Sequence, residues 1–306
     1  MARYIIKRLI LLFPVVFGVA TLVFFLIHMI PGDPVEVMLG ETAMPSAKED
    51  LRKALGLDKG LAEQYITFLK NTASGDLGRS LHTSRPVLSA VIERYPATLE
   101  LTITALIISI LISIPAGIIS AVKKNSIIDR LAMLSALFGV SIPNFWLGPL
   151  LIILFSVQLG LLPVAGRESI YHLILPALTL GMGMAAILSR MTRASMLEVL
   201  NKEYITAARA KGLSNFAVIV KHGLRNALIP VVTVIGLQFG ALLSGAVITE
   251  TIFSWPGIGR LMIQAINTRD YPLVQGCILI IALSYVLINL LTDILYAYID
   301  PRIRYE

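Results

Sequence analysis

The sequence predicts an all-α membrane protein with six transmembrane helices. Three observations point to this fold class: 56% of the residues are hydrophobic, only 15% are charged, and the mean hydropathy is +0.80. Soluble domains average about 45–50% apolar and about 25% charged residues, so this chain of 306 residues belongs in a lipid bilayer. The net charge of +7 is dispersed among loops between apolar stretches, which indicates a role in membrane topology and excludes nucleic acid as a partner.

The six spans are expected where about 20 apolar residues, enough for one crossing, follow one another. A retained first helix is favoured over a signal peptide, because Leu9–Ile30 is too long for a signal h-region and no small-x-small cleavage site follows. The third span is expected to be broken by Pro143 and Pro149, and the short fourth span to begin near Pro176. The expected spans are residues 9–30, 97–121, 131–158, 174–190, 227–250 and 274–297.

The basic residues predict the topology. Fifteen of the 26 Lys and Arg residues, against five acids, fall in the N-terminal stub, the two even-numbered loops and the C-terminal tail. The opposite side holds 11, and eight of these share one long segment with nine acids. Since positively charged loops stay in the cytosol, both termini are expected to be cytosolic.

The chain is therefore expected to have three parts. Residues 1–30 form a cytosolic stub and the first span, residues 31–96 an extracytoplasmic helical segment, and residues 97–306 a core with five spans. In the outer segment, Ser46–Glu49 reads as a capping box for a helix that Gly56 ends, and Leu61, Tyr65 and Phe68 predict a second helix. This helical pair is expected to lie against the membrane core or a partner, with a spacer as the alternative.

The motifs of common enzymes are missing from the sequence. It contains no H-E-x-x-H, no G-x-S-x-G and no G-x-x-x-x-G-K-[ST], and its single cysteine, Cys277, cannot form an intrachain disulfide. The sequence thus predicts no catalytic residue, no metal site and no cofactor in this chain. The four histidines are scattered: His28, His82, His172 and His222.

Polar and small residues within the spans have two interpretations each. Glu250, expected near the outer end of span five within reach of water, and Asn289 with Asp293 in span six could belong to a pathway or gate. Alternatively they make polar contacts between helices or snorkel to the surface. A row of small residues at four-residue spacing predicts close helix packing in span five: Gly236, Gly240 and Ser244.

The polar island Arg190–Asn226, between spans four and five, is expected to be cytosolic and carries seven basic residues against two acids. Apolar positions recur through it with helical spacing at Met196, Leu197, Leu200, Tyr204, Ala207 and Ala208. Gly212 is a suitable C-terminal stop, and Ser214 can cap a second, shorter helix through Lys221. The result is a helix–turn–helix with Leu213 and Phe216 at the bend. A docking surface is favoured over a segment lying on anionic lipid, because the glycine interrupts a continuous interfacial helix.

These residues resemble the "EAA" loop of ABC importer permeases. Thr206-Ala-Ala-x-x-x-Gly212 fits its pattern, with Thr206 in place of the usual glutamate and Arg225 about where a proline is usual. The resemblance extends over the whole chain. The chain is similar to the "B"-type subunit of the dipeptide/oligopeptide permease family, a binding-protein-dependent transport system inner membrane component. The motifs that carry it include HMIPGDP (28–34), GDLGRSL (75–81), PATLELT (96–102), ARAKGL (208–213), RNALIP (225–230), ETIFSWPGIGRL (250–261), RDYPLV (269–274) and DPRIRY (300–305).

The resemblance implies a type I importer fold with a coupling helix between spans four and five, in a bacterial or archaeal cytoplasmic membrane. It implies a second permease of similar fold, two ATPase subunits that hold ATP and Mg, and an extracytoplasmic solute-binding protein. The substrate would be a di- or oligopeptide, with glutathione or nickel as alternatives, and an autonomous channel or secondary carrier is the alternative of another class. The residues implied in ATPase coupling are Tyr204, Thr206, Ala207, Ala208, Arg209, Lys211, Gly212, Leu213 and Phe216.

Overall fold

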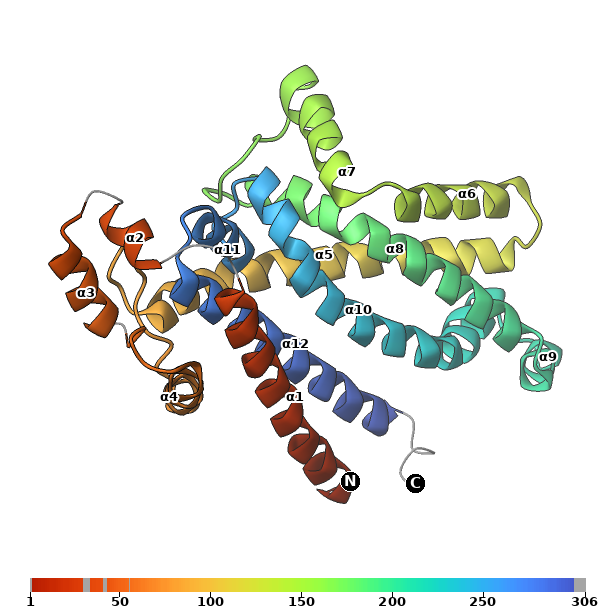
Figure 1. The fold of residues 1–306 in the computed structure, drawn as a ribbon. Helices are drawn as coiled ribbons and strands as arrows, with labels where there is room; N and C mark the ends of the chain where they lie inside the picture. Colours follow the sequence, from red (N-terminus) through yellow and green to blue (C-terminus); the bar gives the residue numbers. More distant parts are fainter. Residues whose placement is uncertain (1, 30–33, 41–42, 55, 300–306) are drawn as a thin grey trace. The chain divides into compact units, whose positions relative to one another are not determined.

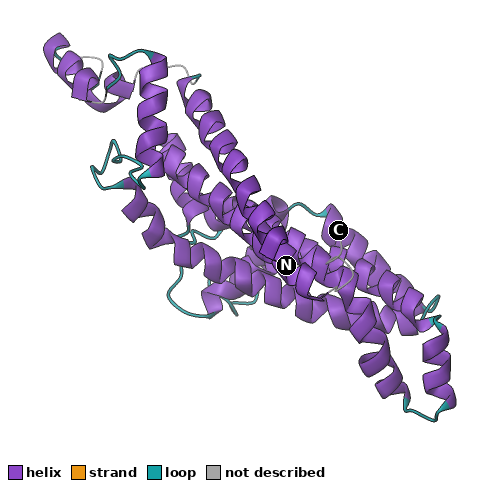
Figure 2. Ribbon diagram, turned by 90° about the horizontal axis from the view of Figure 1, so that it is seen from below, coloured by secondary structure: helices purple, strands orange, loops and turns teal. Residues whose placement is uncertain are grey.

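The expected all-α architecture is confirmed. The computed structural model describes residues 2–29, 34–40, 43–54 and 56–299, and within these ranges it contains helices and loops but no strand beyond one isolated bridge, Arg79 to Pro86 (Figures 1 and 2). The elements are α1 (Ala2–His28), α2 (Pro34–Leu39), α3 (Pro45–Ala54), α4 (Leu61–Ala73), α5 (Val87–Val122), α6 (Ile127–Ser141), α7 (Asn144–Leu151), the π-helical segment η1 (Ile152–Gln158), α8 (Tyr171–Leu200), α9 (Glu203–Ala210), the π-helical segment η2 (Ala217–Leu224), α10 (Arg225–Ile252), α11 (Ile258–Asn267) and α12 (Tyr271–Ile299).

The chain forms two compact units. Unit 1 comprises Leu99–Trp255 and the described residues from Leu287 onward, and unit 2 comprises Ala2–Thr98 and Pro256–Val286. The long helices α5 and α12 therefore each contribute to both units.

Among the residues that the structure describes, four helices are long and apolar enough to cross a membrane: residues 87–122, 171–200, 217–243 and 271–292. A fifth crossing is possible if α6 and the α7–η1 segment, which meet at a bend of 107°, count as one broken span. The bend confirms the break expected at Pro143, but Pro149 lies within α7 and does not interrupt it. In α1 the apolar stretch with described side chains is Ile10–Leu26, shorter than a full span.

Unit 1 is built around α8, which packs against α10, α6 and α7 (Figure 1). Small residues let the backbones come close together. A Cβ atom on Gly181 would lie 2.7 Å from the carbonyl oxygen of Ala105 in α5, and one on Gly139 of α6 would lie 3.0 Å from the Cβ of Ala186. Because lipid provides no hydrophobic drive between helices, such close contact is what holds membrane helices together.

In unit 2 the second helix expected within residues 31–96 is α4, and it lies on α1. Tyr65 of α4 shares a 2.7 Å hydrogen bond with Thr21, and the Phe68 ring centroid lies 5.4 Å from that of Phe24. The helix expected before Gly56 is present as α3, and Gly56 adopts the positive φ of +68° that favours glycine at a helix end. The expected capping role of Ser46 is wrong, because α3 already begins at Pro45 and Ser46 lies inside its first turn.

Two of the quoted motifs, distant in sequence, meet in unit 2 around Asp270. This buried carboxylate accepts hydrogen bonds from the Ser80 hydroxyl at 2.5 Å and the Leu81 amide at 3.2 Å, and it also accepts from the Leu273 amide at the start of α12. His82 bonds the Thr268 carbonyl oxygen at 2.6 Å. The GDLGRSL and RDYPLV motifs are therefore held together by hydrogen bonds.

The contact of α5 with α8 gives a stability prediction. A Cβ on Gly117 of α5 would lie 2.5 Å from the Thr192 Cβ and 2.8 Å from the Ser189 carbonyl oxygen. We expect Gly117→Ala to destabilise the fold by about 1–3 kcal/mol, because the helices must separate, and to lower the melting temperature of the detergent-solubilised protein.

Gly183→Ala in α8 is the matched control. Its Cβ would meet only the Gly139 carbonyl oxygen at 3.7 Å, an ordinary contact. Equal melting temperatures for the two variants would contradict the close-packing argument.

Candidate functional site

Residues 203–216, called here the elbow, connect α8 to the η2–α10 helix within unit 1. After α8 ends at Leu200, a short turn leads into α9, and Gly212 reverses the chain with a φ of +76°. The Ser214 hydroxyl then accepts a hydrogen bond from the Ala217 amide at 3.3 Å. The glycine stop and the serine cap expected from the sequence are both present.

The helix boundaries around the elbow differ from expectation in two places. Met196, Leu197 and Leu200 belong to the end of α8 rather than to the helix that carries Tyr204, because the turn at Asn201 separates them. The helix after Ser214 does not end near Lys221. It continues through η2 into α10 as far as Ile252, because a π-helical segment accommodates the join without a break.

The elbow is held in place from within. Ile205 is fully buried and Ala208 nearly so, and both pack with buried Val218 against Val199 and Leu200. Sequence reasoning named Ala208 as a coupling residue but missed Ile205. Their i, i+3 spacing on α9 is the signal that could have identified this inward face.

The outward side of the elbow is apolar and basic. Phe216 is 76% exposed, Tyr204 42% and Leu213 41%. The Tyr204 hydroxyl accepts a 3.0 Å hydrogen bond from the Asn226 side-chain amide, which fixes the ring beside the start of α10. The remaining residues implied in coupling are also exposed: Thr206, Ala207, Arg209, Lys211 and Gly212. Such a tip offers exposed apolar area and positive charge that a partner protein could cover. The described side chains of the elbow do not include a nucleophile hydrogen-bonded to a base.

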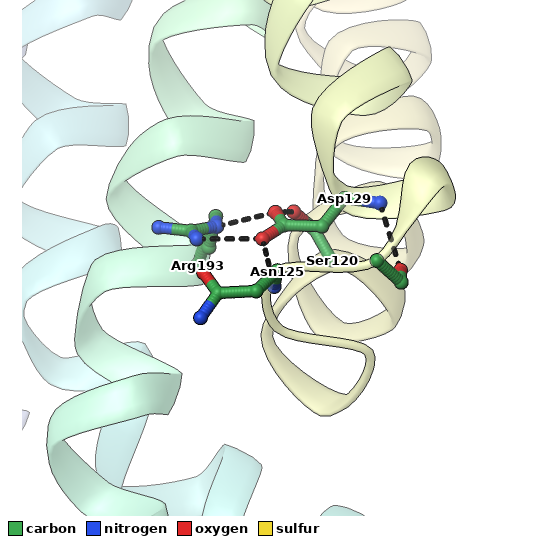
Figure 3. A network of polar contacts seen from close by, with 5 residues as sticks. Ser120, Asn125, Asp129 and Arg193 are labelled. Carbon is green, nitrogen blue, oxygen red and sulfur yellow. Dashed lines mark hydrogen bonds and ion pairs between the residues drawn. The ribbon is translucent and has the colours of Figure 1, made fainter.

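An ion pair that the sequence did not reveal, between a buried Asp129 and a partly buried Arg193, also lies in unit 1 (Figure 3). Arg193 of α8 holds Asp129 of α6 with two parallel hydrogen bonds, Nε to Oδ1 at 2.7 Å and Nη2 to Oδ2 at 2.8 Å. The Ser120 hydroxyl and the Asn125 amide donate to the same carboxylate. From the sequence alone, Asp129 and Arg193 were only charges in two different loops.

The small-residue row of α10 contacts α12 at one position in unit 1. A Cβ on Gly236 would overlap the side chain of Thr292, so the two helices are in direct contact there. Gly240 is buried, and the side chain of Ser244 lies outside the described residues. The packing role of the full row stays a prediction.

Of the polar residues in the spans, Glu250 differs from expectation. It was expected where water can reach it, yet its side chain is fully buried. The turn that follows α10 contains buried Phe253 and Trp255, and the Trp255 amide donates to the Glu250 backbone carbonyl oxygen at 2.8 Å. Asn289 has a buried Oδ1 without a hydrogen-bond partner among the described residues, and the side chain of Asp293 lies outside them.

Apolar spanning helices packed around α8, with an exposed elbow between two of them, define a multi-pass helical membrane protein. Comparison with known proteins narrows this class. The family described as "Binding-protein-dependent transport system inner membrane component" matches residues 113–305, and its N-terminal counterpart matches residues 1–102. The chain belongs to this family, whose members are transport permeases of the inner membrane rather than enzymes.

Two relatives align with this chain over its full length and over their own full length. The chain is 49% identical to the "Glutathione transport system permease protein GsiC" of Escherichia coli O6:H1 over 306 residues, and 49% identical to the "Dipeptide transport system permease protein DppB" of Alkalihalophilus pseudofirmus over 333 residues. The resemblance to permease subunits of the dipeptide/oligopeptide family of ABC importers is thereby confirmed.

Solved structures share the fold. Two crystal forms of the inward-facing MetNI methionine ABC transporter match with TM-scores of 0.58 and 0.60 at 20% identity, covering 71% of this chain and 100% of the solved chain.

The inward face of α9 gives a prediction. Ile205→Ala should destabilise the elbow by about 2–5 kcal/mol, because it leaves a cavity against Val218 and Leu200. Amide hydrogen exchange in residues 203–216 should become faster.

Thr206→Ala changes the exposed neighbour on the same helix and should leave that exchange unaltered. Slow exchange in both variants would contradict the anchoring role of Ile205.

Proposed function

We propose that this chain forms half of the translocation pathway of an ATP-driven importer of short peptides. The observation that carries the proposal is the match over the whole chain to permeases named for dipeptide and glutathione transport, both at 49% identity. Glutathione is a tripeptide, so the two names agree on a small peptide as cargo. A glutathione importer is the second candidate, supported by the first of these relatives.

The proposed topology has six spans with both termini in the cytosol. The four long apolar helices and the bent α6–α7–η1 pair supply five spans, and α1, with its apolar stretch Ile10–Leu26, would supply the sixth. The excess of basic residues supports placing the elbow on the cytosolic side. Residues 1–30, 31–96 and 97–306 would then be the first span, an extracytoplasmic segment and the core.

The elbow is the proposed docking site for an ATPase subunit. Its exposed Phe216, Leu213 and Tyr204 offer apolar area, and Arg209 and Lys211 offer charge to an acidic rim. Burying a Phe side chain stabilises an interface by about 1.5–3 kcal/mol, so Phe216 is the expected anchor of this contact. The inward packing of Ile205 and Ala208 makes the elbow rigid enough to transmit a push.

The complex would contain a second permease of similar fold, two ATPase subunits that bind ATP and Mg, and a binding protein that selects the peptide. The missing phosphate loop supports placing ATP on a partner. Closure of the ATPases would bring the two elbows together and tilt the spans behind them. Only a higher affinity of ATP for the closed state can drive this change.

Phe216→Asp is expected to weaken co-purification of the ATPase subunits about tenfold or more, because it removes the apolar anchor and places a charge in the contact. The measurement is the yield of ATPase subunits on the tagged permease from solubilised membranes.

Phe216→Leu keeps an apolar side chain and should retain most of the assembly. Full assembly with Phe216→Asp would overturn the elbow as the docking site. Peptide uptake by this chain alone in liposomes, without nucleotide, would favour an autonomous channel or carrier instead.

The cognate binding protein is expected to release heat on titration with a dipeptide in a calorimeter. The same protein is also titrated with glutathione and with nickel, so that binding of the three candidate substrates can be compared. Binding of glutathione alone would select the second candidate, and binding of nickel alone would overturn a peptide cargo.

A further inference from the structure

We propose that the Asp129–Arg193 pair is a positioning contact that makes the α5–α6 turn move together with the elbow. The proposal rests on the proposed function, because it assumes that force enters the chain at the elbow. The contact touches neither peptide nor nucleotide, and its role is to keep transport tied to ATP hydrolysis.

The first argument is that the Asp129 carboxylate is fully engaged. It is only 3% exposed, and Arg193 binds both of its oxygens at 2.7 and 2.8 Å. The Asn125 amide donates to Oδ2 at 2.8 Å and the Ser120 hydroxyl donates to Oδ1 (Figure 3). A bidentate pair with these additional donors fixes direction as well as distance, so α8 holds the end of α5 and the start of α6 at one point.

The second argument is that α5 and α8 are closely packed at Gly117 and again at Ala121, on both sides of Ser120. Gly117, close to Ser120 along α5, lies against Thr192. Ala121, next to Ser120, packs in one cluster with Met196 of α8 and Ala227 of α10. Because side chains on α8 are packed at both positions, this packing together with the ion pair resists sliding of the α5–α6 turn along α8.

The third argument is continuity with the elbow. Arg193 lies about two turns before the end of α8, where Val199 and Leu200 receive the inward face of α9. A displacement of α9 therefore reaches Arg193 through one rigid helix and reaches Asp129 through the ion pair. From Asp129 it enters α6, which packs along α8 and ends at the 107° bend before α7.

The test compares Asp129→Asn and Arg193→Lys in the complete importer, with its partner permease, ATPases and binding protein, in proteoliposomes. Asparagine keeps the shape but removes the charge, and lysine keeps the charge but cannot bind both oxygens as the guanidinium does. We expect normal assembly and ATP hydrolysis, with peptide transported per ATP hydrolysed falling about tenfold for Asp129→Asn and less for Arg193→Lys.

Glu198→Gln is the matched control, since Glu198 forms an exposed pair with Lys202 at 3.1 Å near the end of the same helix. It should leave the ratio of transport to hydrolysis unchanged. An unchanged ratio for both test variants would overturn the proposal, as would a parallel loss of transport and hydrolysis, which indicates a purely structural anchor.

If Asp129→Asn does not assemble, Ser120→Ala decides, because it removes one donor and leaves the ion pair in place. A lowered ratio for this variant supports the positioning role and an unchanged ratio overturns it. Phe216→Asp in the same system separates the two proposals. If it keeps the ATPases bound, the elbow is not their docking site. An unchanged ratio for the Asp129 and Arg193 variants, with the ATPases lost from Phe216→Asp, removes only the positioning role.

Discussion

The close contact of α8 with its neighbours is the constraint on which unit 1 depends. Of the four long apolar helices, α8 is the most buried, and it meets α5 and α6 through Gly181, Gly117 and Gly139 with almost no side chain in between. In lipid, association depends on packing and on satisfied polar groups, so an added methyl group at these positions pushes helices apart. The position of the elbow follows from this packing, because α8 carries it.

Polar groups mark the ends of the packed helices. Asp129 and Arg193 pair at one end of α6, and Arg167 binds Glu100 of α5 through Nε at 2.8 Å and Nη2 at 2.5 Å while lying over the Trp255 ring. Removing one partner of a buried pair leaves an uncompensated charge, which costs more than a surface pair contributes. The Asp129–Arg193 pair, with its carboxylate buried and its guanidinium partly buried, therefore restrains the fold more strongly than the exposed Glu198–Lys202 pair at the end of α8.

Much of the architecture could be predicted because hydrophobic length and glycine chemistry are local properties. The break at Pro143, the stop at Gly212 and the helix from Leu61 were all readable from short windows. The end of α8 was not, because the apolar spacing continues from Leu200 to Tyr204 across a turn. The burial of Glu250 was missed because burial depends on tertiary contacts, which a short sequence window does not contain.

The sequence by itself determined that the chain is a helical membrane protein, which family it resembles and where its exposed elbow bends, because composition, motif order and a positive-φ glycine do not depend on distant contacts. Only the tertiary structure decided which side of α9 faces inward and which charges meet. Ile205 and Ala208 are buried because α8 and η2 converge there. Asp129 forms an ion pair with Arg193, 64 positions away in the sequence, because the α5–α6 turn packs against α8.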